Sequence, residues 1–196
     1  PIVFEKNEKP GGMLTYGIPS YKLEKDVVEA EIDIIRALGV EIKCGVEVGK
    51  DITLDELRKD GYEAFYIAIG CQGSRKSGVD GEDADGVMSA VDILHEIAEN
   101  HDLNLKGNKT VVIGGGNVAV DVARSTKRCG AHVLGMFCLE SREEMPASEE
   151  EIFETEDEGI QINNGWGVKE ILAENGKVTG VVLKKCTSVK DADGKF

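Results

Sequence analysis

A glycine-rich turn between an apolar strand and a helix constrains the fold of this chain more than any other feature. The apolar run at 110–113 leads directly into Gly114-Gly115-Gly116, and helical periodicity follows over 117–129. A second strand is expected at 132–137, so the order is strand, turn, helix, strand. The turn has the G-x-G-x-x-A spacing in the context that a dinucleotide-binding βαβ unit requires. The pattern predicts an α/β chain with a Rossmann-like sheet.

Each small residue of the turn has a physical role. Gly114 permits the tight bend, Gly116 lets the backbone approach a pyrophosphate, and Ala119 keeps the helix close to the strand. The helix N-terminus offers N–H groups and a positive dipole end to the phosphates. The alternative is a plain strand-to-helix turn without a ligand. We predict a nicotinamide dinucleotide site formed by Gly114, Gly115, Gly116, Asn117, Val118 and Ala119.

The same fingerprint predicts an acid about 20 residues downstream that binds the ribose hydroxyls. Glu140 lies 24 residues after Gly116, just past the second expected strand. Its neighbourhood is rich in glutamate, so the alternative is ordinary surface charge, but its position in the unit favours ribose binding. Arg142 follows it and is a second candidate ligand. On the helix, Asp121 and Arg124 fit a functional face and a solvated face equally well.

Charge and cysteine usage exclude several classes of function. The net charge of −14 argues against nucleic acid or an anionic membrane surface as a partner, because both require clustered cations. No apolar run approaches the ~20 residues of a membrane span. The five cysteines include no C-x-x-C pair, which disfavours a disulfide framework, a zinc site and a dithiol centre. Reduced thiols predict a cytoplasmic protein, and we predict no metal ligands.

The rest of the chain is expected to add further α/β structure. Before the glycine turn we expect strands at 2–5, 40–44 and 64–69 and helices at 23–38, after Thr53, and from Ser89 to about 99. After it we expect an acidic helix from Ser148 to about 158 and a hairpin of strands 167–173 and 178–185 around Asn175-Gly176. Asp193-Gly194 is a second turn signal. Because the chain opens inside an expected strand, we expect an internal piece of a longer protein.

Several stretches together resemble a known family, the small subunit of bacterial glutamate synthase and its relatives. These are flavoproteins that pass electrons from NAD(P)H through FAD to iron–sulfur partners. The matching stretches are Val3-Phe4-Glu5-Lys6, Gly11-Gly12-Met13-Leu14-Thr15-Tyr16-Gly17-Ile18-Pro19, Ala68-Ile69-Gly70, Gly114-Gly115-Gly116-Asn117-Val118-Ala119-Val120-Asp121 and Ser141-Arg142-Glu143-Glu144-Met145-Pro146-Ala147.

The resemblance implies a three-layer FAD/NAD(P)-binding fold, with an NAD(P) domain at 105–196 inserted in a truncated FAD domain at 1–104. It implies FAD contacts at Glu5, Lys6, Gly11, Gly12, Leu14, Ala68 and Gly70. Without it, Gly11-Gly12 would be an ordinary turn. The FAD domain's own glycine fingerprint, its closing segment and the cysteines for iron–sulfur clusters lie outside this chain, so the chain alone is expected to be inactive.

The resemblance also implies the chemistry of the parent protein: hydride transfer from the nicotinamide to FAD, then electron transfer to iron–sulfur centres in a partner subunit or domain. The cofactors perform this chemistry, so we predict no catalytic side chain. NADPH-dependent relatives usually place two arginines where this chain has Leu139 and Glu140, so we predict a preference for NAD(H). Two alternatives are a catalytically silent NAD-sensing module and a thiol-disulfide flavoenzyme of the thioredoxin reductase type, which requires the missing C-x-x-C pair.

Overall fold

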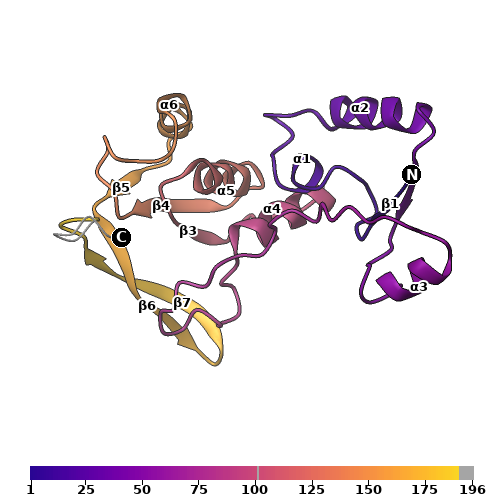
Figure 1. The fold of residues 1–196 in the computed structure, drawn as a ribbon. Coiled ribbons are helices and arrows are strands. Elements are labelled where there is room, and N and C mark those ends of the chain that lie inside the picture. Colours follow the sequence, from indigo (N-terminus) through magenta and orange to yellow (C-terminus); the bar gives the residue numbers. More distant parts are fainter. Residues whose placement is uncertain (101, 190–196) are drawn as a thin grey trace. The chain divides into compact units, whose positions relative to one another are not determined.

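The computed structural model describes residues 1–100 and 102–189 (Figure 1). The chain divides into two compact units, Pro1–Gly73 and Ser74–Phe196. This division does not coincide with the expected domain boundary near residue 104. The reason is that helix α4 (Ala90–Glu99) packs against helix α5 (Asn117–Arg128) and shares its apolar core. The assignment of 1–104 to FAD and 105–196 to NAD(P) stays a prediction.

The first unit is built around two short parallel strands. Strand β1 (Ile2–Glu5) pairs in register with β2 (Glu41–Cys44), and helix α2 (Lys25–Ala37) lies between them in sequence. The unit also contains α1 (Met13–Tyr16), which falls inside the expected glycine loop, and α3 (Leu54–Lys59). The helix expected after Thr53 is confirmed, and it begins with a capping box, in which the Thr53 and Glu56 side chains each accept the other's backbone N–H.

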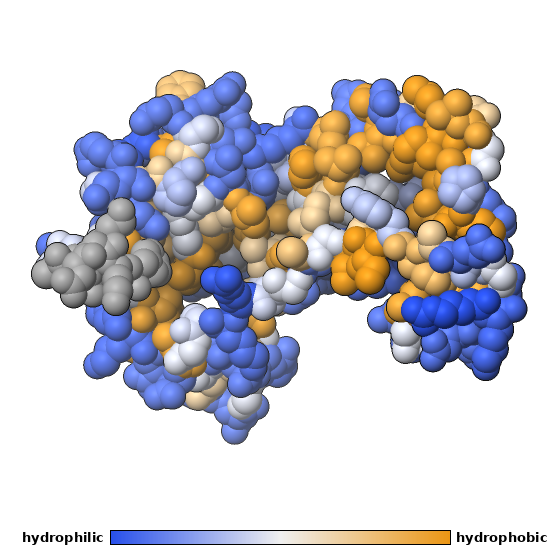
Figure 2. All heavy atoms as spheres, viewed as in Figure 1, coloured by the Kyte–Doolittle hydropathy of each residue, from blue (hydrophilic) through white to orange (hydrophobic). Residues whose placement is uncertain are grey.

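Helix α2 exposes much of its apolar side. Val28 and Ile32 are buried, whereas Val27 and Ile34 are exposed, and Leu38, the residue that follows the helix, is 79% exposed. Figure 2 shows apolar residues gathered over α2. The periodicity of this stretch therefore predicts the helix correctly, but it does not predict how many of its apolar side chains are buried.

The prediction of a strand at 64–69 is wrong. These residues adopt no regular structure, and the side chains of Tyr66, Ile67 and Ile69 are exposed, Ile69 to 80%. A strand requires a neighbouring strand to satisfy its N–H and C=O groups, and no described residue pairs with this run. The apolar run thus lacks the sheet that would bury it. Ala68 and Gly70, two of the predicted flavin contacts, lie in this exposed segment.

The second unit contains the predicted βαβ unit. Its parallel sheet has the order β3 (Lys109–Ile113), β4 (His132–Cys138) and β5 (Ile162–Asn164). Helix α5 connects β3 to β4, and α6 (Glu149–Asp157) connects β4 to β5. Because parallel strands run in the same direction, the turn after β3 and the segment after β4 meet at one edge of the sheet. The α/β Rossmann-like class is confirmed, and strand β5 was not expected from the sequence.

The apolar core of the second unit lies where α4, α5 and α6 meet the parallel sheet. Its fully buried side chains include Val120 of α5, Met136 of β4, Ile152 of α6 and Ile160 just before β5. Full burial of such a side chain stabilises the fold by about 1.5–3 kcal/mol. This core fixes α5 against the sheet and so fixes the position of the glycine turn.

The C-terminal hairpin is confirmed. Strands β6 (Trp166–Glu174) and β7 (Lys177–Lys185) pair antiparallel, and Asn175 and Gly176 both have positive φ angles at the turn. Residues 80–85 attach to this hairpin by backbone hydrogen bonds, such as Ile171 N–H to the Asp80 carbonyl at 2.9 Å. The second expected turn, Asp193-Gly194, lies outside the described residues. Among the described residues, no helix is long and apolar enough to cross a membrane.

We expect amide hydrogen exchange to be slowest in residues 109–137 of the second unit. This stretch holds the centre of the buried core, whereas the buried hydrophobic side chains of the first unit are Tyr16, Val28, Ile32 and Leu57. Exchange measured by mass spectrometry tests this, with the exposed segment 64–69 as the fast-exchanging reference. Strong protection concentrated in residues 1–60, with little in 109–137, would contradict the assignment.

Candidate dinucleotide-binding site

The glycine turn has the geometry that its sequence predicts. Gly114 has a φ of +135°, and its N–H donates to the Phe137 carbonyl at 2.9 Å, which ties the turn to β4. A Cβ atom built on Gly114 would lie 3.2 Å from the Cβ atom of Ala119. Both the positive φ and this close approach favour glycine here. The tight turn and the close helix therefore depend on the small residues that the fingerprint specifies.

Glu140 lies beside the glycine turn. A Cβ atom on the buried Gly115 would lie 2.9 Å from the Cβ atom of Cys138 and 3.0 Å from Oε2 of Glu140. The structure thus brings together the turn and the acid that sequence reasoning paired across 24 residues. The absence of a side chain at Gly115 leaves room for the Glu140 carboxylate next to the backbone of the turn.

The start of helix α5 is open to a ligand. The carbonyl of Gly116 accepts the N–H groups of Ala119 and Val120 at 3.0 and 3.2 Å. The N–H groups of Asn117 and Val118 precede these and have no intrahelical acceptor, as at every helix N-terminus. Both residues are exposed. Their N–H groups and the helix dipole can therefore stabilise a phosphate at this point.

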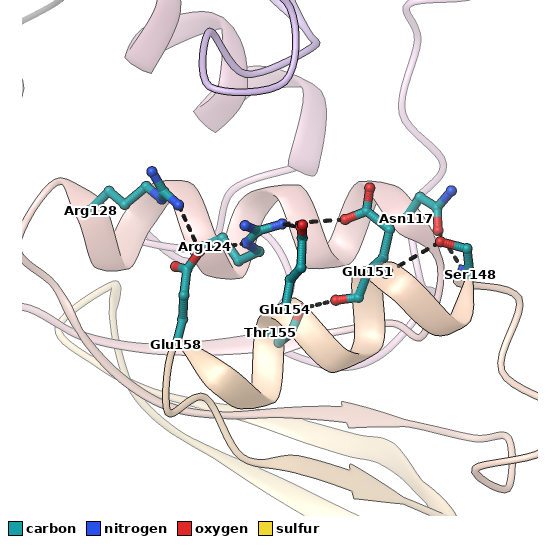
Figure 3. Close-up of polar contacts among 8 residues, drawn as sticks. All are labelled: Asn117, Arg124, Arg128, Ser148, Glu151, Glu154, Thr155 and Glu158. Atoms are coloured by element: carbon teal, nitrogen blue, oxygen red, sulfur yellow. Dashed lines mark hydrogen bonds and ion pairs between the residues drawn. The ribbon is translucent and has the colours of Figure 1, made fainter.

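A segment after the expected acid closes one side of the turn. The N–H of Ala147 donates to the Gly115 carbonyl at 3.1 Å, and the N–H of Ser148 donates to Oδ1 of Asn117 at 3.0 Å (Figure 3). The Ser148 hydroxyl in turn accepts the N–H of Glu151 and caps α6. The sequence indicated the cap on α6, but not that this segment would bind the glycine turn.

The two helices beside the site are joined by an ion cluster around Arg124 (Figure 3). The Arg124 side chain is only 6% exposed. Its guanidinium lies 2.8 Å from Glu158 and 2.5 Å from Glu154, and Arg128 lies 2.7 Å from the same Glu158 oxygen. Asp121 is also buried. The alternative of a solvated helix face for Asp121 and Arg124 is therefore wrong.

The cluster holds its acid in the charged form. Burial opposes ionisation of Glu158, but the hydrogen bonds from Arg128 and Arg124 outweigh it, and the pKa of Glu158 lies below its ordinary value. A lowered carboxyl pKa in the folded state adds stability above the ordinary pKa of a glutamate. That stability is lost as the pH falls through the lower folded-state pKa.

Arg142 faces helix α6. Its Nη2 atom lies 3.4 Å from Oε2 of Glu156, an exposed pair on the acidic segment. In this arrangement Arg142 pairs with a carboxylate of the acidic segment. Its assignment to the cofactor site stays a prediction.

The cysteines offer no redox pair. Cys44, Cys71, Cys129, Cys138 and Cys186 are all free. Burial raises the pKa of the Cys138 thiol, which keeps it protonated and unreactive. In the part of the chain that the structure describes, no three His, Cys, Asp or Glu side chains gather to hold a metal ion.

The flavin-contact residues expected at 5–14 lie in the first unit. Glu5 ends β1, and its Oε1 atom accepts the Asn7 N–H at 2.9 Å, while Lys6 is exposed. Gly11 and Gly12 both have positive φ angles, and the exposed Leu14 follows in α1. Sequence reasoning missed Lys25, whose ammonium group donates to the Leu14 carbonyl at 2.8 Å and so fixes this loop against α2. Burial lowers the pKa of Lys25.

The comparisons with known proteins define the class of this chain. Residues 6–196 match the model of the pyridine nucleotide-disulphide oxidoreductase family, so the chain belongs to that family. The strand, glycine turn, helix and strand described above have the order of the dinucleotide-binding βαβ unit.

Particular relatives are named as subunits of NADP(+)- or NADPH-dependent enzymes. The chain is 39% identical to the beta subunit of the NADP(+)-dependent formate dehydrogenase of Moorella thermoacetica, over 96% of this chain and 26% of the relative. It is 34% identical to the small chain of the NADPH glutamate synthase of Escherichia coli K12, over 99% of this chain and 43% of the relative. The expected resemblance to the glutamate synthase small subunit is confirmed. The chain spans less than half the length of these relatives.

Solved structures show the same fold. FprA from Mycobacterium tuberculosis, in complex with NADPH, is 20% identical with a TM-score of 0.76, over 99% of this chain and 58% of that chain. The thioredoxin reductase of T. acidophilum is 21% identical with a TM-score of 0.60, over 95% of this chain and 63% of that chain. At these identities the likeness supports the Rossmann-like fold.

We expect Arg124→Met to destabilise the second unit by about 2–3 kcal/mol, because it leaves carboxylates of α6 without their buried partner. Arg128→Met is the matched control. It removes a half-exposed arginine from the same Glu158 and should cost about 1 kcal/mol or less. Urea denaturation of both variants measures the difference. Equal losses would show that the buried position of Arg124 is not what stabilises the α5–α6 contact.

Proposed function

We propose that this chain is the nicotinamide-dinucleotide-binding part of an electron-input module in a flavoprotein oxidoreductase. In the complete protein, a hydride would pass from NADH to FAD, and electrons would continue to iron–sulfur centres, as the resemblance to the glutamate synthase small subunit implies. The observation that carries the proposal is the Glu140 carboxylate, which lies beside Gly115 on a strand-to-helix turn with the dinucleotide spacing.

The chain's residues would have distinct tasks toward the dinucleotide. The backbone of Gly114, Gly115 and Gly116 gives close approach, and the first N–H groups of α5 stabilise the pyrophosphate charge. Glu140 accepts hydrogen bonds from the ribose hydroxyls. The bound nicotinamide and flavin rings supply the redox chemistry, so the protein's task is binding, orientation and electrostatics. No side chain of this chain is assigned a catalytic role.

A preference for NADH over NADPH follows from charge. A 2′-phosphate carries close to two negative charges and is usually bound by arginine side chains. This chain has Leu139 and Glu140 where the family's NADPH-dependent members usually have an arginine pair. From 140 to 158 there are ten acids and one base, Arg142, and that base pairs with Glu156. The relatives reported above are named for NADPH or NADP(+), so a preference for NADH would distinguish this chain from them.

The flavin side of the proposal rests on the first unit. Glu5, at the end of a parallel strand, is of the type and position that binds a ribose, and the positive φ angles of Gly11 and Gly12 permit close backbone approach. We assign FAD contact to these residues together with Lys6, Leu14, Ala68 and Gly70. The same proposal includes an iron–sulfur partner subunit or domain and a cytoplasmic location. It also places the boundary between the FAD and NAD(P) domains near residue 104. A thiol-disulfide mechanism is disfavoured, because the sequence has no C-x-x-C pair.

We expect the 196-residue chain to bind NADH about ten- to a thousandfold more tightly than NADPH, the scale of an unpaired or repelled charge. The double variant Leu139→Arg/Glu140→Arg supplies two cationic donors. It should therefore lower the ratio of the NADPH to the NADH dissociation constant at least about tenfold. Nicotinamide fluorescence titration with both cofactors gives the four dissociation constants.

Two single variants distinguish an effect of Glu140 itself from an effect of the overall charge near the site. Glu140→Arg should shift the ratio, whereas Glu143→Arg makes the same charge change at an exposed neighbour and should leave it almost unchanged. If the unchanged chain binds both cofactors equally, or if Glu143→Arg shifts the ratio as far as Glu140→Arg, Glu140 is not the selector. If neither cofactor binds, the dinucleotide site itself is wrong.

A further inference from the structure

The backbone of Glu140 is fixed by the end of strand β5. The Glu140 carbonyl accepts hydrogen bonds from Nδ2 of Asn164 at 3.1 Å, from the N–H of Gly165 at 3.1 Å and from the thiol of Cys138 at 3.8 Å. In the parallel register of β4 and β5, Cys138 pairs with Asn164. Glu140 is two residues past the end of β4, so the Asn164 side chain and Gly165, the residue after β5, extend past the end of β4 to hold it.

The same asparagine also contacts the residue beneath the glycine turn. Nδ2 of Asn164 lies 3.3 Å from the sulfur of Cys138, which is only 2% exposed. A Cβ atom built on Gly115 would lie 3.3 Å from that sulfur. One half-buried amide group therefore connects the acid after β4 with the thiol on which the turn rests.

Glu140 needs such an anchor because the chain around it is irregular. Residues 139–148 contain bends and turns and no strand or helix. The direction of a carboxylate depends on the position of its own backbone, and a group that recognises a ligand must be held by bonds from the residues behind it. The bonds to the Glu140 carbonyl supply this restraint. Two of them come from side chains, and the amide of Asn164 lies nearer to the carbonyl than the thiol of Cys138 does.

We infer that Asn164 is a positioning residue that determines cofactor specificity by holding Glu140 beside Gly115. The inference rests on the proposed function of Glu140. Asn164 does not touch the dinucleotide. It fixes the backbone from which the carboxylate accepts the ribose hydroxyls, and in its absence the carboxylate leaves the position that excludes a 2′-phosphate.

The neighbouring Asn163 provides a matched control. It is half-buried in the same strand, and its Nδ2 atom donates to another β4 carbonyl, that of Met136, at 3.1 Å. Asn163→Ala and Asn164→Ala thus each remove one amide-to-carbonyl hydrogen bond between β5 and the β4 chain. They differ in whether the lost bond restrains Glu140.

The experiment measures the ratio of the NADPH and NADH dissociation constants for the 196-residue chain and its variants, with thermal unfolding recorded for each. Asn164→Ala should lower the ratio about three- to tenfold, the scale of one hydrogen bond. Asn163→Ala should leave the ratio unchanged, although both variants lose similar stability. If Asn164→Ala does not fold, Asn164→Leu, which conserves the volume and removes the donor, takes its place.

A double-mutant cycle with Glu140→Gln shows whether Asn164 acts through Glu140. In the Glu140→Gln background, Asn164→Ala should no longer change the ratio. The inference is overturned if Asn164→Ala leaves the ratio intact, if Asn163→Ala lowers it equally, or if the effect persists without Glu140. If Glu140→Gln alone leaves the ratio unchanged, the proposed selector role fails first and the inference falls with it.

Discussion

The close packing of the glycine turn against the end of β4 and the start of α5 is the constraint on which the site depends. Side chains at Gly114 or Gly115 would meet Ala119, Cys138 and Glu140 at 3.2 Å or less. Because no Cβ atom intervenes, the helix N-terminus, the acid and the backbone of the turn occupy one edge of the sheet. The buried core of α4, α5 and α6 and the ion cluster of Arg124 keep α5 in the place that this packing requires.

The sequence allowed prediction of those parts of the fold whose signals are local. The βαβ unit, the Thr53 and Ser148 caps and the hairpin at Asn175-Gly176 each carry their own turn or cap chemistry within a few residues. The pairing of Glu140 with the glycine turn was also predictable, because parallel strands bring their carboxyl ends together. The identity of the residues that hold Glu140 was not, since β5 is three residues long and has no apolar alternation.

The wrong strand prediction at 64–69 and the incomplete burial of α2 have one physical origin. The run at 64–69 has the composition of a buried strand, and α2 has the periodicity of a buried helix, yet both expose large apolar side chains. A hydrophobic pattern indicates which side chains of a segment can be buried. Whether they are buried depends on a second surface that packs against them. The cluster of Arg124 shows the reverse case, in which charged residues that suited a solvated face are buried because α6 supplies carboxylates opposite them.

The central claim is that the turn at 114–118 binds the pyrophosphate of a nicotinamide dinucleotide. Its most direct test is two-dimensional NMR of the isotope-labelled chain during addition of NADH. The account predicts that the largest shifts of backbone amide signals occur at Gly115, Gly116, Asn117 and Val118, with a smaller change at Glu140. Unchanged signals in this turn at saturating NADH, or the largest shifts in the hairpin of β6 and β7, would contradict the account.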